Sequence, residues 1–166
     1  MMRPAYVQRM ARYNRWQNES LYGAADRLSD AERRSDRGAF FKSIHGTLSH
    51  LLWGDGQWMS RFEKQRLPPG GIKEYASLFP DWSDLKAKRI AMDQRIVDWA
   101  GRVDDDWLSG QIAWFSSAAQ RDVVKPTWEI MVHFFNHQTH HRGQVHAMLT
   151  QAGGKPHDTD IWLMPE

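Results

Sequence analysis

The segment PTWEIMVHFFNHQTHHRGQVHAMLTQAGG, residues 126–154, decides the fold because it has the pattern of one long amphipathic helix. Pro126 suits the first turn of a helix, and the pair Gly153 and Gly154 stops one, so we predict a helix over residues 126–152. At about 100° of rotation per residue, six side chains fall within an arc of about 80°. They are Ile130, Phe134, His137, His141, Val145 and Met148. This stripe predicts the face that packs against the rest of the protein.

Apolar residues at helical spacing predict three further long helices, and these cover residues 4–28, 39–64 and 83–102. Gln17 interrupts the stripe of the first helix. After that helix, Ser29 and Glu32 have the spacing of a capping box for a short extra turn. The breakers in LPPGG end the second helix, and Ser83 is the expected N-cap of the third.

The segment before the last helix has a different character. Residues 107–124 contain two β-prone stretches around a Ser/Ala-rich turn, which predicts a short hairpin. The tail after the last helix carries Ile161, Trp162 and Leu163, which we expect to dock on the body. The sequence thus predicts one all-α domain over residues 1–166, a four-helix bundle with a short hairpin or loop insertion before the last helix.

The composition narrows the possible functions. The chain of 166 residues has a net charge of +2, and its 22 basic residues are scattered, unlike the clustered stripe of a nucleic-acid surface. It has no cysteine, which excludes disulfides, cysteine-ligated zinc and a cysteine nucleophile. No signal-peptide pattern and no apolar run of about 18 residues occurs. We therefore expect a soluble, cytoplasmic protein with no nucleic-acid or membrane partner.

Two histidines on the apolar stripe of the last helix need an explanation, because a buried imidazole must have its nitrogens satisfied. His137 and His141 are four residues apart, a spacing that lets two rings on one helix face share a cation. Gln138 stands where a zincin would carry its general-base glutamate. Hydrogen bonding to other core groups is the alternative explanation. His133 and His140 lie at the edge of the stripe or beyond it.

His50 on the second helix is the candidate third ligand. Gly46 and Gly54 flank it at four residues on either side, and glycine inside a helix costs about 1 kcal/mol relative to alanine. Their presence indicates that space is kept for a metal, a ligand or a closely packed helix. His45 lies away from this face, and we expect it to be a capping or surface residue.

These segments resemble the DinB/YfiT-like superfamily. The similarity covers nearly the whole chain and is carried mainly by SIHGTLSHLLWGD and FNHQTHHRGQVHAML. It implies a four-helix bundle, often a homodimer, with a divalent metal held by three histidines. Matched position by position, these are His50, His137 and His141. Zinc or nickel is the first expectation, with iron or manganese as further possibilities.

Relatives in this superfamily include thiol-dependent S-transferases, which leads to our first functional hypothesis. A small-molecule thiol bound at the metal would attack an electrophilic substrate. The candidate groove residues are Trp53, Gln57, Trp58 and Arg142, with Arg142 expected at a rim. A metal-dependent hydrolase, with Asp55 as general base, is the second hypothesis. A non-catalytic metal- or ligand-binding protein of the stress response is the third.

Overall fold

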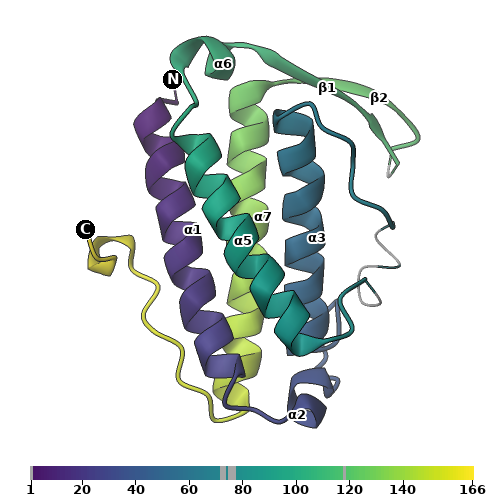
Figure 1. Cartoon of the computed structure of the whole chain (residues 1–166), viewed down its shortest axis with the longest axis vertical. Helices are drawn as coiled ribbons and strands as arrows, with labels where there is room; N and C mark the ends of the chain where they lie inside the picture. Colours follow the sequence, from purple (N-terminus) through teal and green to yellow (C-terminus); the bar gives the residue numbers. More distant parts are fainter. Residues whose placement is uncertain (1, 72–73, 75–77, 118) are drawn as a thin grey trace.

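Four long helices make up most of the structure, a computed structural model that describes residues 2–71, 74, 78–117 and 119–166. They are α1 (Pro4–Ala25), α3 (Ile44–Phe62), α5 (Trp82–Ala100) and α7 (Thr127–Gln151). α1 and α7 run in one direction, and α3 and α5 run in the other (Figure 1). α1 packs against α5 and α7, and α3 packs against the same two helices. The predicted positions of the four helices are confirmed, apart from the end residues discussed below.

The predicted hairpin is confirmed as a small antiparallel sheet beside the first turns of α7. β1 (Gln111–Ser116) pairs with β2 (Arg121–Pro126), and Gln111 lies opposite Pro126. A short helix that the sequence did not predict, α6 (Asp105–Ser109), precedes it, capped by the Asp104 carboxylate, which accepts a hydrogen bond from the Trp107 N–H at 2.7 Å. Throughout the described ranges, every helix is too short or too polar to cross a membrane.

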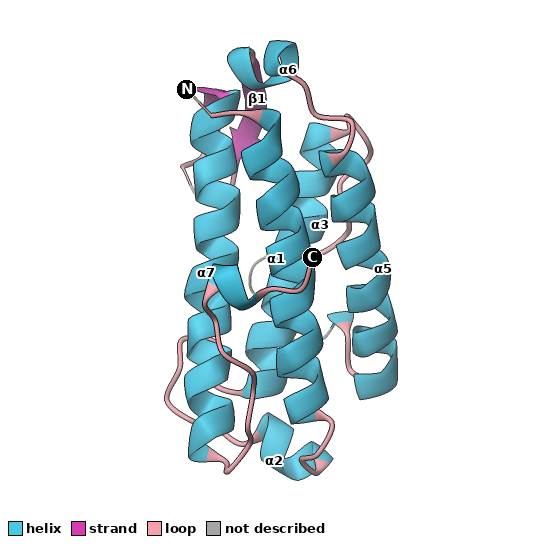
Figure 2. Cartoon of the chain, turned by 90° about the vertical axis from the view of Figure 1, so that its left-hand side faces the viewer, coloured by secondary structure: helices cyan, strands magenta, loops and turns pink. Residues whose placement is uncertain are grey.

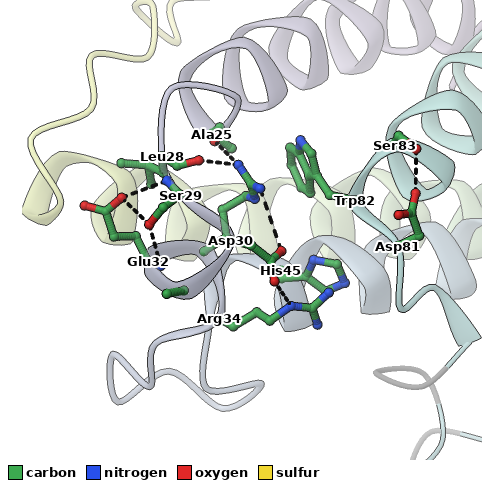
Figure 3. A network of polar contacts seen from close by, with 12 residues as sticks. Ala25, Leu28, Ser29, Asp30, Glu32, Arg34, His45, Asp81, Trp82 and Ser83 are labelled. Carbon is green, nitrogen blue, oxygen red and sulfur yellow. Dashed lines mark hydrogen bonds and ion pairs between the residues drawn. The ribbon is translucent and has the colours of Figure 1, made fainter.

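The short helix α2 (Asp30–Arg34) has the predicted capping box (Figure 3). The Ser29 hydroxyl accepts a hydrogen bond from the Glu32 N–H at 3.3 Å, and the Ser29 N–H donates to the Glu32 carboxylate at 2.7 Å. Two of the orphan N–H donors at this helix start are therefore satisfied within four residues.

One predicted helix start and one predicted helix cap were wrong. The second long helix begins at Ile44 and not at residue 39, because the Ser43 hydroxyl caps it by accepting from the Gly46 N–H at 3.0 Å. The residues before it form a tight turn closed by a bridge between Ala39 and Lys42. The third long helix is capped by Asp81 in place of the predicted Ser83, and the Asp81 carboxylate accepts from the Asp84 N–H at 2.8 Å.

The C-terminal tail docks by a different means from the one expected. Trp162 is 75% exposed and its two apolar neighbours are also exposed, whereas Met164 is buried. The tail runs back along the outer side of α1 (Figures 1 and 2). Tyr13 and Gln17 donate hydrogen bonds to tail carbonyls, at 2.6 and 3.0 Å. Gln17, the interruption in the apolar stripe of α1, is thus a buried donor to the tail.

The core consists of two apolar clusters with polar residues between them. One cluster includes Val7, Met59, Ile96 and Phe134, and the other includes Leu21, Leu48, Leu85 and Val145. On each long helix, buried polar side chains fall between residues of the two clusters. This set, which we call the polar layer, comprises Asn14, Asn18, Asp55, Arg89, Asp93, Gln138 and Arg142.

Arg89 is the centre of the polar layer. Its guanidinium lies 2.7 Å from an Asp55 oxygen and 2.8 Å from an Asp93 oxygen, and all three side chains are almost fully buried. Asn18 donates to Asp93 at 2.8 Å, and Gln138 donates to Asp55 at 3.0 Å. The layer therefore links all four long helices through charged and hydrogen-bonded contacts.

Replacing Arg89 should destabilise the fold far more than replacing its exposed neighbour. Arg89→Met leaves two carboxylates buried without their cation, so we expect the free energy of unfolding in urea to fall by about 3–5 kcal/mol. The control is Lys88→Met, which removes an exposed pair with Asp84 and should cost less than about 1 kcal/mol. Equal losses for the two variants would show that the polar layer does not hold the helices together.

Candidate metal centre

The structure brings the three predicted histidines together. His50 comes from α3, and His137 and His141 lie one turn apart on α7. One ring nitrogen from each lies within 4.8 Å of the other two. The Nε2 atoms of His50 and His137 are 3.1 Å apart. We call these three residues the histidine triad.

The separation of one pair of ring nitrogens fits that of two metal ligands. Two nitrogen ligands of a tetrahedral zinc ion, each about 2.0–2.1 Å from the metal, lie about 3.3 Å from one another. The observed Nε2–Nε2 separation of 3.1 Å is close to this value. Without a metal, the same separation allows a hydrogen bond between the two rings. That the triad binds a metal stays a prediction.

The two glycines that flank His50 have different roles. A Cβ atom on Gly54 would lie 3.1 Å from Cε1 of His137, so this glycine makes room for the His137 ring beside α3. A Cβ atom on Gly46 would lie 2.4 Å from the Phe41 carbonyl oxygen. Gly46 therefore allows the turn before α3 to cross the helix closely. Gly54 thus makes room for a candidate ligand, and Gly46 makes room for the backbone of Phe41.

Phe41 is a residue of the site that the sequence analysis missed. Its ring stacks on His50, with centroids 3.8 Å apart and an interplanar angle of 21°, and its centroid lies 5.3 Å from that of His141. We had placed Phe41 inside a helix, which would have pointed it elsewhere. The N-cap signal at Ser43 could have revealed that the helix starts after Phe41.

The triad imidazoles are neutral at physiological pH. Burial, together with the neighbouring His137 and His141 rings, lowers the pKa of His50 to about 3. Burial and the His141 ring lower the pKa of His137 to about 4, and burial also lowers the pKa of His141. A neutral imidazole keeps the nitrogen lone pair with which it binds a metal.

Gln144 orients the His141 ring. Its amide oxygen lies 2.8 Å from Nδ1 of His141. Because an amide oxygen only accepts hydrogen bonds, this contact places the ring proton on Nδ1 and leaves the Nε2 lone pair free to act as a ligand. Such outer contacts fix the tautomer of metal-binding histidines in known sites.

The remaining histidines of α7 and α3 lie around the triad or away from it. His140 packs against His141, with centroids 4.8 Å apart, and His133 packs against Trp58 at 5.2 Å. Both are exposed, as expected for the edge of the stripe. The expectation for His45 was wrong: it is buried, and its Nε2 lies 2.8 Å from the Phe79 carbonyl oxygen.

Three of the four groove candidates lie on α3. The Trp53 ring centroid is 5.9 Å from that of His50, which places this indole beside the triad. Its N–H donates to the Gly70 carbonyl at 3.3 Å, and Gln57 donates to the Pro68 carbonyl at 3.1 Å. Both side chains therefore also anchor the segment that follows α3.

Arg142 and Asp55 belong to the polar layer. The rim position expected for Arg142 was wrong, because α1 covers this side of α7 and leaves the arginine only 5% exposed. Burial lowers the pKa of Arg142 to about 10, which keeps it charged at neutral pH. Asp55 is buried as predicted, but its two oxygens accept hydrogen bonds from Arg89 and Gln138.

Comparison with known proteins agrees with this arrangement. The model of the DinB family matches residues 1–166. Protein DinB of Bacillus subtilis (strain 168) is 26% identical over 156 residues, a match that covers 91% of this chain and 88% of that protein. The extent of the family match and the convergence of the triad lead to one conclusion: the chain belongs to the DinB family.

Proposed function

We propose that this protein is a metal-dependent enzyme that transfers a small-molecule thiol to an electrophilic substrate. In this proposal His50, His137 and His141 hold a divalent metal, with zinc or nickel expected first. The observation that carries it is the meeting of three neutral imidazoles, two of them buried and that of His137 half-buried, with a ligand-like separation of 3.1 Å between two of them. Three protein ligands are typical of catalytic metal sites, which keep a position open for substrate.

A divalent metal at the triad would lower the pKa of a bound thiol and present its sulfur as a thiolate. The chain itself contains no cysteine, so the thiol comes from a cosubstrate. Neutral imidazoles leave the charge of the cation uncompensated, which favours an anionic sulfur over a neutral one. The thiol proton passes to solvent, the sulfur–carbon bond forms, and the bond to the leaving group breaks.

The aromatic side chains beside the triad suit this chemistry. Phe41 stacks directly on His50, and the Trp53 ring centroid lies 5.9 Å from that of His50. Their apolar faces limit the access of water to the triad and offer a surface to an apolar electrophile. Trp53 is therefore the groove candidate that this proposal retains.

The two alternative functions differ in what they need from the chain. A hydrolase needs a general base, and the only carboxylate predicted for that role, Asp55, is held by Arg89 and Gln138 in the polar layer. A non-catalytic protein would bind the metal without turnover. The homodimer, the cytoplasmic location and the classification of the four helices as a typical family bundle stay predictions that rest on the resemblance.

A thiol-transfer assay tests the proposal against both alternatives. Zinc- or nickel-loaded protein should accelerate the reaction of 1-chloro-2,4-dinitrobenzene with at least one of glutathione, cysteine and 2-mercaptoethanol, followed by absorbance of the thioether. His141→Ala should reduce the rate to the metal-free background because it removes a ligand. The matched control, His140→Ala, should keep the wild-type rate. Full metal loading with no thiol turnover would contradict the enzyme, and turnover of esters alone would favour the hydrolase.

The lowered pKa values predict an unusual pH dependence of metal affinity. Protons compete with the metal only once a ligand ring is protonated, and the pKa values of His50 and His137, about 3 and about 4, place that competition in acid. Between about pH 8 and about pH 5.5, zinc affinity measured by competition with a chelator should fall less than about tenfold. Three rings with the ordinary pKa of about 6.5 would lose about a thousandfold over this range. A loss of that size, with unchanged circular dichroism, would show that burial does not keep the triad neutral.

A further inference from the structure

A cavity lies on another side of α7 from the triad. It has a volume of about 380 Å³, is open to solvent on one side, and is lined by residues of α1, α7 and the C-terminal tail. Its polar lining comes mainly from Tyr13, Gln17, Thr139, Arg142 and His146. The triad joins α7 to α3, whereas this cavity occupies the groove between α7 and α1. We call it the α1–α7 cavity.

Arg142 is a buried cation without a carboxylate partner. Its guanidinium donates hydrogen bonds to the side-chain oxygens of Asn14 and Thr139, both of which are neutral. The other buried arginine of the polar layer, Arg89, instead contacts two carboxylates within 2.8 Å. Among the described residues, no ion pair involves Arg142. A guanidinium has five N–H donors, so three of those of Arg142 remain for another acceptor.

Gly143 keeps space beside this cation. It lies in the middle of α7 and lines the cavity, and a Cβ atom built on it would meet nothing within 4 Å. Glycine weakens a helix, and no neighbouring atom requires one here. Gly143 is itself exposed, so a side chain at this position would narrow the opening beside Arg142 without meeting a neighbouring atom.

The tail lines the cavity but does not neutralise the charge of Arg142. Tyr13 and Gln17 bind the carbonyls of residues 159 and 158, so the tail contributes main-chain oxygens to these contacts. The side chains of Asp158 and Asp160 are exposed to solvent, where water screens their charges. The buried guanidinium is thus the main charge on the cavity wall.

We propose that the α1–α7 cavity binds the anionic oxygen group, a carboxylate or a phosphate, of a small molecule, with Arg142 as its anchor. Arginine forms strong, charge-assisted hydrogen bonds with such groups. The cavity volume lies within the range of small-molecule sites. This site is independent of the metal centre and of the function proposed for it.

Calorimetric titration of the full-length protein tests the proposal, with succinate and inorganic phosphate as separate probes. At least one probe should bind saturably to the wild type, and the one that binds identifies the anion class. Gly143→Met adds a side chain beside Arg142, and because methionine favours helix, the variant should fold. We expect it to weaken binding about tenfold or more, the loss expected when the anion can no longer form a hydrogen bond with the charged guanidinium. Arg142→Met should have the same effect.

The matched control is Arg12→Gln, which removes one positive charge from the exposed surface of α1 and should leave binding unchanged. Two results would overturn the proposal. One is the failure of both probes to bind the wild type saturably. The other is binding that survives Gly143→Met but is lost in His50→Ala, which would assign the anion to the triad.

Discussion

The pairing of Arg89 with Asp55 and Asp93 is the constraint on which the arrangement of the helices depends. Asp93 reaches the buried Arg89 guanidinium from its own helix, one turn further along α5, and Asp55 reaches it from α3. Because a buried pair is strongly destabilised when one partner is removed, α3 and α5 dock in the register that brings Asp55 to Arg89. Gln138 extends this constraint to α7 through its hydrogen bond with Asp55. These polar contacts add a register requirement to the close packing of the apolar clusters.

The candidate metal centre is built directly beside that constraint. Asp55 follows Gly54 in the sequence, and Gln138 follows His137. The contact that aligns Asp55 with Gln138 therefore also brings the His137 ring opposite the glycine that makes room for it. The polar layer and the triad are two neighbouring levels of one interface between α3 and α7. Both oxygens of Asp55 accept hydrogen bonds within the layer, so Asp55 serves to align α3 with α5 and α7.

Helical periodicity was enough to predict the long helices and the face on which His137 and His141 lie, and the glycines around His50 correctly signalled a close approach. Periodicity does not reveal which distant segment covers a given face. For that reason the sequence predicts a rim position for Arg142, although α1 buries it. It also predicts that Phe41 belongs to the second long helix, although that helix begins only at Ile44. The prediction that Ile161, Trp162 and Leu163 dock the tail failed for a related reason, because the tail is held by its main-chain carbonyls.

The HHRGQ part of the motif serves two sides of one helix. His141 is a member of the triad and Gln144 contacts its ring, while Arg142 and Gly143 line the α1–α7 cavity. A single turn of α7 thus carries a candidate metal ligand with its orienting partner and a buried cation with its adjoining space. Occupancy of either site would constrain the same turn of helix.

The central claim is that the histidine triad is a metal site, and diffraction from zinc-soaked crystals, measured on both sides of the zinc absorption edge, tests it most directly. The account predicts one anomalous peak between the three rings, with bonds of about 2.0–2.1 Å to a nitrogen of each and to Nε2 in the case of His141. A map without a peak at the triad, or with zinc only on exposed histidines such as His133 and His140, would contradict it.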